Sequence, residues 1–334
     1  MLPIGKVPND ILERVVFKRT GAKLDRVVLG PAIGEDAAVV DMGDRYVVIA
    51  SDPITGASSG IGWYAVHVNA NDVAVRGATP LFLTLTILLP KDVSVGLLDE
   101  VVNDAHSAAM ELGVSIVGGH TEVVSFLSHP VVCGTMIGEV EKGKLVTTGG
   151  AKPGDVILIT KHAGLEGASI IASERYNELV EVVGRGVLER AKSFSRMLSV
   201  VKEALALNEG CKVTAMHDPT EGGVIGGLIE LSIASNVGFR VDGAKIPVAE
   251  ETRRICEVLG VNPLRLISSG VLLATVDEEA VDDAVKALKD AGVKFSIIGE
   301  VVDEGRIIEG PEGKVYLGDE IVEELWVALE REID

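Results

Sequence analysis

Strand-type and helix-type patterns alternate along almost the whole chain, and this alternation limits the possible folds more than any other feature of the sequence. The β-branched run 45–50 and the alternating run Leu81–Leu89 predict strands, whereas segments 61–76 and 97–112 predict helices. The same order continues with expected strands at 131–140, 156–160, 271–276 and 295–301, and expected helices near 166–180, 186–207, 219–234 and 278–291. The chain is therefore expected to be an α/β or α+β protein, in which helices cover sheets.

The length and one turn cluster indicate two domains. At ~100–200 residues per domain, a chain of 334 residues has room for two. The strongest turn cluster runs from Gly149 to Asp155 and contains three glycines and a proline. We therefore expect an N-terminal mixed α/β domain over residues 1–150 and a C-terminal α/β domain over residues 151–334.

The charge balance excludes several classes of partner. Acidic residues outnumber basic ones by 50 to 31, which gives a formal charge of −19. Nonspecific nucleic-acid binding and docking on anionic membranes both need a basic surface. No apolar run approaches the ~18 residues of a membrane-spanning helix, and segment 1–6 lacks a signal-peptide core. We expect a soluble, cytoplasmic protein without a nucleic-acid or membrane partner.

The composition also bears on the compartment and the source organism. The three cysteines, Cys133, Cys211 and Cys256, are far apart and form no C-x-x-C pair, which suits a reducing compartment and excludes a disulfide scaffold. Glutamine is absent from the sequence, while Glu, Lys and Arg are plentiful. Scarcity of a thermolabile amide beside many charged residues predicts a thermophilic source.

One glycine-rich segment imitates a dinucleotide-binding turn. Segment 55–62 (TGASSGIG) follows a strand and opens a helix, as in short-chain dehydrogenases. However, about fifty residues precede it, residues 52–54 separate it from the strand, and no tyrosine has a lysine four positions on. A nicotinamide-dependent oxidoreductase is thus a distant alternative. A Walker-type P-loop is also absent, because each Gly-Lys pair is followed by an aliphatic residue.

Four aspartates lie where strands or turns meet helices, and together they are candidate metal ligands. They are Asp36, Asp52, Asp72 and Asp218. Carboxylates brought together by a fold can hold Mg²⁺, usually with substrate phosphates completing the coordination. Each also has an ordinary structural explanation: Asp218 precedes a proline and suits a helix N-cap, and Asp36 and Asp52 suit turns.

Asp72 is the hardest of the four to explain by local structure. Asn69, Asp72 and Arg76 share one face of the helix expected at 61–76, and Asn and Asp are poor residues for a helix interior. This polar stripe between apolar neighbours predicts that the helix face lines a site, with plain solvent exposure as the alternative.

A second candidate for anion binding is the segment Gly118-Gly119-His120-Thr121. It follows the aliphatic run Val114–Val117, and paired glycines after a strand let backbone N–H groups approach an anion closely. A turn without a ligand explains the glycines equally well. His120 is either a phosphate partner or a loop histidine, and the sequence does not separate these alternatives.

Taken together and in this order, the motifs resemble a known superfamily over nearly the whole chain. It contains aminoimidazole ribonucleotide (AIR) synthase, thiamine-monophosphate kinase, selenophosphate synthetase and the hydrogenase-maturation factor HypE, and the HypE-like branch is the most similar. The matching pieces are Ile33–Val39 (IGEDAAV), Ser51-Asp52, His67–Asp72 (HVNAND), Arg76–Pro80 (RGATP), Gly118–Thr121 (GGHT) and Asp218–Gly223 (DPTEGG).

The resemblance implies a fold, a dimer and a site. In this superfamily the sheet of the N-terminal domain pairs with that of a second copy, and ATP lies between the two domains with Mg²⁺ bridging carboxylates and phosphates. Carried over to this chain, the resemblance makes Asp36, Asp52, Asp72 and Asp218 metal and phosphate ligands. It makes Gly118, Gly119, His120 and Thr121 phosphate-binding, Asn71 a site-lining amide, and Lys6 a phosphate partner from the N-terminal segment.

The shared chemistry of the superfamily is ATP-dependent activation of an oxygen, by phosphorylating a carbonyl or amide oxygen or by transferring phosphate. We therefore expect an ATP- and Mg²⁺-dependent homodimeric enzyme that acts on a small-molecule or protein-borne acceptor. The alternative is a non-catalytic nucleotide-binding partner in a maturation complex.

Two reactions of the superfamily need a thiol that this sequence lacks at the expected place. HypE carries a carbamoyl group on a C-terminal cysteine, whereas this sequence ends Glu330-Arg331-Glu332-Ile333-Asp334. Selenophosphate synthetase needs a cysteine or selenocysteine near its N-terminus, and here none precedes Cys133. We expect no thiocarbamate to form on the cysteines of this chain.

Overall fold

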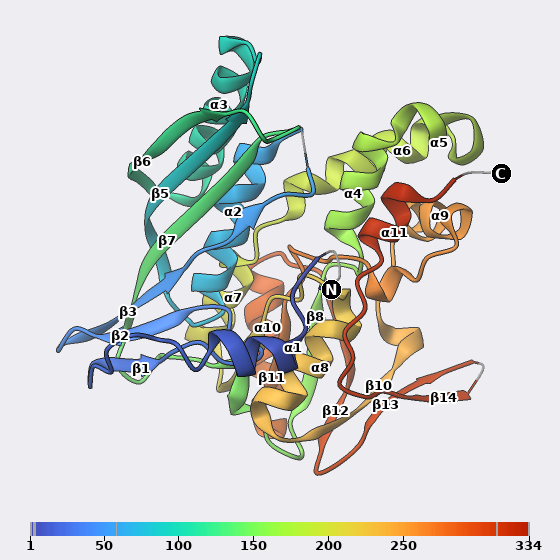
Figure 1. The fold of residues 1–334 in the computed structure, drawn as a ribbon. Coiled ribbons are helices and arrows are strands. Elements are labelled where there is room, and N and C mark those ends of the chain that lie inside the picture. The colour runs from blue at the N-terminus through green and yellow to red at the C-terminus, as the bar shows by residue number, and fades with distance from the viewer. Residues whose placement is uncertain (1, 3–4, 58, 312, 333–334) are drawn as a thin grey trace.

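Two mixed sheets, each of seven strands, organise the protein in this computed structural model, which describes residues 2, 5–57, 59–311 and 313–332 (Figure 1). The strands of the first sheet all precede residue 142, and those of the second all follow residue 155. The α/β fold class predicted from the alternating patterns is confirmed. The predicted division at residue 150 falls between the two sheets and stays a prediction as a domain boundary.

The first sheet has the strand order β1-β2-β3-β7-β5-β6, with β4 paired to β7. Its neighbouring strands are antiparallel except for β5 and β6, which are parallel. The strands are β1 (Val27–Leu29), β2 (Ala38–Asp41), β3 (Arg45–Ala50), β4 (Pro53–Ile54), β5 (Thr79–Pro90), β6 (Ser115–Val124) and β7 (Val131–Glu141).

Helices α2 (Ile61–Ala74) and α3 (Val95–Leu112) cover one face of this sheet (Figure 1). Alternate residues of β7, among them Val132 and Met136, are fully buried on that face. The strand approaches α2 so closely that a Cβ at Gly134 would lie 2.5 Å from Nδ2 of Asn69. The opposite face stays partly exposed, as the 43% exposed side chain of Phe82 shows.

The second sheet is covered on both faces. Its strand β11, which lies between β8 and β9, is buried along its whole length, and α8 packs on one face while α7 and α10 pack on the other. The strand order is β14-β13-β10-β12-β8-β11-β9. The strands are β8 (Val156–Thr160), β9 (Val213–His217), β10 (Gly238–Asp242), β11 (Leu273–Val276), β12 (Phe295–Val302), β13 (Arg306–Gly310) and β14 (Gly313–Tyr316).

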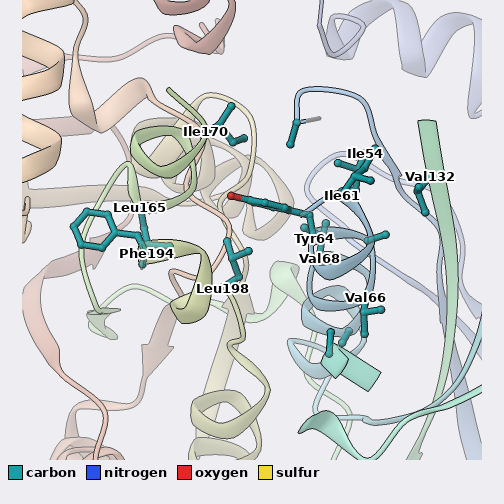
Figure 2. Packing of buried hydrophobic residues seen from close by; sticks show 14 of the residues in the cluster. Ile54, Ile61, Tyr64, Val66, Val68, Val132, Leu165, Ile170, Phe194 and Leu198 are labelled. Carbon is teal, nitrogen blue, oxygen red and sulfur yellow. The ribbon is translucent and has the colours of Figure 1, made fainter. Parts of the chain in front are cut away.

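A buried hydrophobic cluster joins the two halves of the chain. Figure 2 shows Tyr64 projecting from α2 towards α4, with Ile170 and Leu198 beside it. The Tyr64 hydroxyl lies 3.3 Å from the Ser169 hydroxyl of α4. Because α2 packs on the first sheet and on α4 at the same time, it fixes the position of the second half against the first.

The remaining helices complete the covering layers. They are α1 (Asn9–Ile11), α4 (Leu165–Glu174), α5 (Tyr176–Val183), α6 (Arg185–Lys192), α7 (Val201–Gly210), α8 (Gly223–Ser235), α9 (Glu250–Leu259), α10 (Val281–Asp290) and α11 (Leu325–Glu330). A π-helical turn (Leu12–Val16) and five 3-10 turns join them, at Thr148–Gly150, Ser193–Met197, Gly243–Lys245, Pro263–Arg265 and Glu278–Ala280. In the part of the chain described, no helix is both long and apolar enough to cross a membrane.

Three local predictions were wrong. The helix expected from Pro219 begins at Gly223, so Asp218 does not cap it. The helices expected at 166–180 and 186–207 are broken into shorter helices. The glycines at 118 and 119 lie inside β6 and not in a turn after it. In each case contacts with distant parts of the chain override the local pattern.

Candidate functional site

The polar stripe on α2 holds the loop that carries Asp52. Oδ1 of Asn69 accepts a hydrogen bond from the backbone N–H of Asp52 at 2.8 Å, and Nδ2 of Asn69 donates to the Asp52 carbonyl at 3.2 Å. Asn69 is fully buried, so these hydrogen bonds are shielded from water. The amide thus fixes the backbone of Asp52 beside Asp72, which follows Asn69 on the same face of the helix.

Arg76, on the turn that follows α2, positions the predicted Asp36. Its guanidinium is completely buried and donates to Asp36 Oδ2 at 2.7 Å and to Glu35 Oε2 at 2.5 Å. A buried guanidinium needs such carboxylate partners. The stripe predicted as a lined site therefore positions two of the four candidate aspartates and contains a third.

A second chain of charges reaches Asp36 from the other half of the protein. Nδ1 of His217 lies 3.0 Å from Asp36 Oδ2, and Nε2 lies 3.0 Å from Glu230 Oε2. Against the effect of burial, Asp36 and Glu230 raise the pKa of His217 to about 10. The imidazole is therefore cationic at neutral pH and joins β9, α8 and the first sheet.

Lys6 ends this chain of charges. Its Nζ donates to Glu230 Oε1 at 2.8 Å, which attaches the N-terminal segment to α8. Burial of Glu230 is outweighed by the charges of Lys6 and His217, which lower the pKa of Glu230 to about 2. The predicted lysine thus lies at the site, bound to a carboxylate.

Asp52 and Asp72 form a buried pair of acids. Burial raises the pKa of both, and the charges of Asp52, Asp36 and Asp218 raise that of Asp72 well above its usual range. A side-chain hydrogen bond joins the two carboxyl groups, while Asp72 Oδ2 has no hydrogen-bond partner among the described residues. Without a cation, the two carboxyl groups therefore titrate as a coupled pair, and burial and the neighbouring charges favour the protonated form of Asp72.

Asp218 is buried even more completely. The residue is 1% exposed, and neither of its carboxylate oxygens has a hydrogen-bond partner within the described residues. Burial and then the charge of Asp36 raise its pKa well above the usual range. Orphaned carboxylate oxygens are costly inside a protein, which indicates that something else binds them.

The donor set fits a divalent cation that prefers oxygen. Three orphaned oxygens on Asp72 and Asp218 lie in a region where carboxylates outnumber cations. Among the described residues no group of three or more His, Cys, Asp or Glu side chains is already arranged around a metal position. Mg²⁺ needs no such cage, because it retains waters and takes only one or two carboxylates together with substrate phosphates.

Two cavities adjoin at this site. The inner cavity, of about 270 Å³, is lined by Glu35, Asp36, Asp52, Asp72 and Glu230 among others. The outer cavity, of about 490 Å³, lies between the loop 52–57, α4, the segment 267–269 and the C-terminal segment 323–326. Both cavities share four lining residues: Lys6, Asp52, Thr220 and Glu221.

The predicted phosphate-binding segment 118–121 lies elsewhere. His120 pairs with Thr86, Thr86 with Cys133, and Cys133 with Pro53 across the first sheet. Three strand spacings of ~4.8 Å place His120 about 14 Å from Pro53. Within one chain, strands β5 and β7 therefore separate the segment from the loop of Asp52, and His120 is exposed beside Glu122.

Strand packing explains one of the two glycines in that segment. Gly119 has a φ of +148°, and a Cβ there would lie 1.8 Å from the carbonyl oxygen of Leu85 on β5. Only glycine permits this approach. The phosphate-binding role of Gly118, Gly119, His120 and Thr121 stays a prediction.

Asn71 lies next to the acidic cluster, but its amide is engaged by backbone groups. Its Nδ2 donates to the Leu198 carbonyl, and its Oδ1 accepts from the Val200 N–H, both at 2.8 Å. These bonds attach α2 to the segment before α7. Its predicted role as a site-lining amide stays untested.

Sequence reasoning missed Glu230 and Glu166. Glu230 is a lone acid in the apolar helix α8, where an acidic residue is unusual, and that contrast was an available signal. Glu166 is buried in the first turn of α4 and lines the outer cavity, and no sequence signal distinguishes it from an ordinary N-terminal acid of a helix.

Family models match both halves of the chain. Residues 34–140 match the N-terminal domain of AIR synthase-related proteins, and residues 152–310 match the C-terminal domain. This chain belongs to the AIR synthase-related family. The family predicted from the ordered motifs is confirmed, and so is its mixed α/β fold.

Individual relatives lie in the HypE-like branch of this family. The carbamoyl dehydratase HypE of Cupriavidus necator is 33% identical over 279 residues, which cover 82% of this chain and 76% of that protein. The expectation of an enzyme is confirmed by this match.

Solved structures agree with these relatives. The structure of a HypE–HypF complex matches with a TM-score of 0.75 and 28% identity, over 92% of this chain and 99% of the other. A HypE structure in complex with ATP matches with a TM-score of 0.72 over 96% of this chain and 92% of the other. At 24% identity, the latter match establishes the shared fold.

Proposed function

We propose that this protein is an ATP- and Mg²⁺-dependent enzyme of the HypE type, which phosphorylates an amide oxygen of its acceptor. The observation that carries the proposal is the set of buried carboxylate oxygens on Asp72 and Asp218 without hydrogen-bond partners. The matched HypE proteins are named carbamoyl dehydratases, and one was crystallised with ATP.

Asp36, Asp52, Asp72 and Asp218 would hold Mg²⁺ together with the phosphates, one or two of them directly and the others through its waters. When bound, Mg²⁺ neutralises the charge of the β- and γ-phosphates, which is the main requirement for phosphoryl transfer. Within the chain, Asn69 orients Asp52, Arg76 orients Asp36, and α2 carries Asp72. These elements hold the carboxylates in place before substrate arrives, which is how a site avoids reorganisation during the reaction.

Lys6 is a candidate phosphate partner. It is bound to Glu230 in the structure and lines both cavities. If the Lys6 side chain moved from Glu230 to a phosphate oxygen, its ammonium group would exchange one negatively charged partner for another. The lysine would then close the N-terminal segment over the nucleotide.

The outer cavity suits the acceptor. Its volume of about 490 Å³ falls within the usual range for small-molecule sites. It shares Asp52 with the inner cavity, so an acceptor bound there would lie beside the phosphates. The HypE–HypF complex supports a protein partner for this chain.

The cysteines of this sequence are poor carriers of such a group. Burial raises the pKa of Cys211 to about 11 and that of Cys256 to about 12, so both thiols are protonated at neutral pH. Cys133 lies within β7 of the first sheet. We therefore infer that the acceptor is carried by another molecule.

The first sheet supports the proposed homodimer. Strand β6 forms an edge of the sheet and is exposed on both faces along nearly all its length. Exposed apolar side chains, including Phe82, Val117 and Val123, lie on β5 and β6. A long apolar edge needs covering, and pairing with a second copy is a common solution.

Measurements of ATP consumption test the proposal. Purified protein should bind Mg·ATP and form ADP faster when given a peptide that contains S-carbamoyl-cysteine than when given propionamide or buffer alone. Mg·ATP binding without turnover on any acceptor would favour the non-catalytic alternative. Absence of Mg·ATP binding would contradict both.

A further inference from the structure

A buried carboxyl group on α4 lines the outer cavity, which the acidic cluster borders through Asp52. Glu166 lies in the first turn of α4, is 4% exposed and lines the same cavity as Asp52. Its Oε2 accepts a hydrogen bond from the backbone N–H of Ser269 at 3.2 Å. Both the helix and the Ser269 segment therefore fix its position.

The rest of the outer cavity is mostly apolar near Glu166. Its wall includes Ile54, Val68, Ile170, Ile267, Leu325 and Trp326. An apolar wall excludes water and leaves an uncharged, planar group as the suitable occupant. An amide fits this description, with its oxygen directed to the Asp52 side and its nitrogen to the Glu166 side.

Another glutamate in the same cavity is already engaged. Oε2 of Glu323 accepts from the Gly222 N–H at 2.6 Å, and Oε1 accepts from the N–H groups of Ile267 and Leu325 at 3.2 and 2.6 Å. These bonds attach the C-terminal segment to the loop before α8. Glu323 is therefore a structural anchor, and Glu166 is the carboxyl group suited to proton transfer.

We propose that Glu166 is the general base that removes the acceptor's amide protons. This inference rests on the proposed function and assigns a reacting group to it. The amide oxygen attacks the γ-phosphorus of ATP, the bond from that phosphorus to the bridging oxygen breaks, and ADP leaves. The C–N bond becomes a C=N bond as one N–H proton passes to the Glu166 carboxylate, so the products are a phosphorylated imidate, ADP and a protonated glutamate.

A second proton transfer would complete the dehydration. After Glu166 has released its first proton to solvent, it takes the remaining N–H proton of the imidate. The C–O bond breaks, its electron pair leaves with the phosphate, and the C=N bond becomes a nitrile. The sum of both steps is one ATP and one amide converted into ADP, phosphate, a nitrile and one proton.

The electrostatic surroundings suit a base that works near neutral pH. Burial, together with the charge of Glu221, raises the pKa of Glu166 to about 7 against the opposing effect of the hydrogen bonds from Ser269. The other titratable groups that face it are Asp52, Lys6 and Glu323 in the cavity wall, together with Tyr64 and Asp218. A base whose pKa lies near the working pH transfers protons most effectively.

The decisive variant is Glu166→Gln, with Glu181→Gln on the exposed side of α5 as the matched control. With the S-carbamoyl-cysteine peptide as acceptor, we expect ADP formation by Glu166→Gln to fall at least about 100-fold. The dissociation constant of Mg·ATP should stay within about two-fold of the wild type, since Glu166 is not among the proposed metal ligands. The wild-type rate should rise between pH 6 and 8, and the variant should lose this rise.

A rate within about three-fold of the wild type at every pH would overturn the inference. Glu166→Asp, which withdraws the carboxyl group by one methylene, should react slowly but keep the pH dependence. Infrared difference spectra between wild type and Glu166→Gln test the inference without any acceptor. We expect the band of a protonated carboxyl group at pH 6 and that of a carboxylate at pH 8. A carboxylate band at both pH values would overturn the inference.

The two sets of results distinguish this inference from the proposed function. Loss of Mg·ATP binding by the wild type, or failure to consume ATP with the peptide, would contradict the proposed function whatever the infrared spectra show. If Glu166→Gln formed ADP at the wild-type rate, the proposed function would stand, but Glu166 would not be its general base.

Discussion

Two regions that the sequence marks for phosphate binding lie in different environments. The acidic cluster is deeply buried between the two halves of the chain, where Asp72 and Asp218 are 3% and 1% exposed. The segment Gly118–Thr121 lies on the edge strand β6, exposed and about 14 Å from the loop of Asp52. One region is assembled from residues of a single chain, whereas the other faces outwards.

The difference shows which part of the site a single chain supplies. The buried cluster has its carboxylates oriented by Asn69, Arg76 and His217 of the same chain, so the proposed Mg·ATP site would need no second copy. The edge segment can contribute to a site only if another surface, such as a second copy, covers it. The predictions below test this contrast between a complete buried site and an incomplete exposed one.

The largest effect is expected at the buried cluster. Asp218→Asn removes a charge at constant shape, and two opposite charges about 4 Å apart interact by about 4 kcal/mol in a partly screened site. We expect Mg·ATP affinity to fall about 100-fold or more, measured by calorimetric titration. An unchanged affinity would show that the orphaned oxygens of Asp218 do not serve the nucleotide.

The pH dependence of stability gives the next largest effect. The folded pKa of Glu166, about 7, lies above its ordinary value of 4.5, so its contribution to stability is present below pH 4.5 and is lost as the pH rises through 7. Glu166→Gln should therefore stabilise the protein by on the order of 2 kcal/mol at pH 8 and have little effect at pH 4.5. Urea unfolding at both pH values measures this, and equal effects at both would contradict it.

A smaller effect is expected from disrupting the proposed dimer. Phe82 is 43% exposed on β5, so Phe82→Glu should fold normally while placing a charge in the interface. We expect at least ten-fold weaker dimerisation by sedimentation equilibrium at micromolar concentration, with the exposed Lys91→Glu as a control. A wild-type protein that sediments as a monomer would remove the basis for a second copy over β6.

The smallest effect is expected at the edge segment. His120→Ala should weaken Mg·ATP binding by about five- to ten-fold in the dimer, the cost of losing one hydrogen bond to a charged group. In the Phe82→Glu monomer, His120→Ala should have no effect. Equal effects in monomer and dimer would show that the segment acts within its own chain.

Local pattern was sufficient to predict much of the buried cluster. Helix α2 was predicted over residues 61–76, before the stop signals Gly77 and Pro80, and the placement of Asn69, Asp72 and Arg76 on one face followed from helix geometry alone. That face proved to be the one that orients Asp52 and Asp36. Short-range geometry of this kind needs no knowledge of the rest of the fold.

Features that depend on distant contacts were not predictable in the same way. Gly119 is needed because β6 approaches Leu85 of β5, and Glu230 gains its role from Lys6, which is 224 positions away. Helix α8 begins at Gly223 because the loop before it is held by Glu323 of the C-terminal segment. Nothing in the sequence near these residues specifies such partners.

The most direct test of the account is a calorimetric titration with ATP of wild type, Asp72→Asn and the exposed control Asp99→Asn, each with Mg²⁺ and with EDTA. The buried carboxyl group of Asp72 has a raised pKa and Asn keeps nearly the same shape, so Asp72→Asn should preserve the melting temperature while lowering Mg·ATP affinity at least ten-fold. Wild type and Asp99→Asn should bind tightly only with Mg²⁺. Unchanged affinity in Asp72→Asn together with a lowered melting temperature would show that the acidic cluster is structural, and would contradict the account.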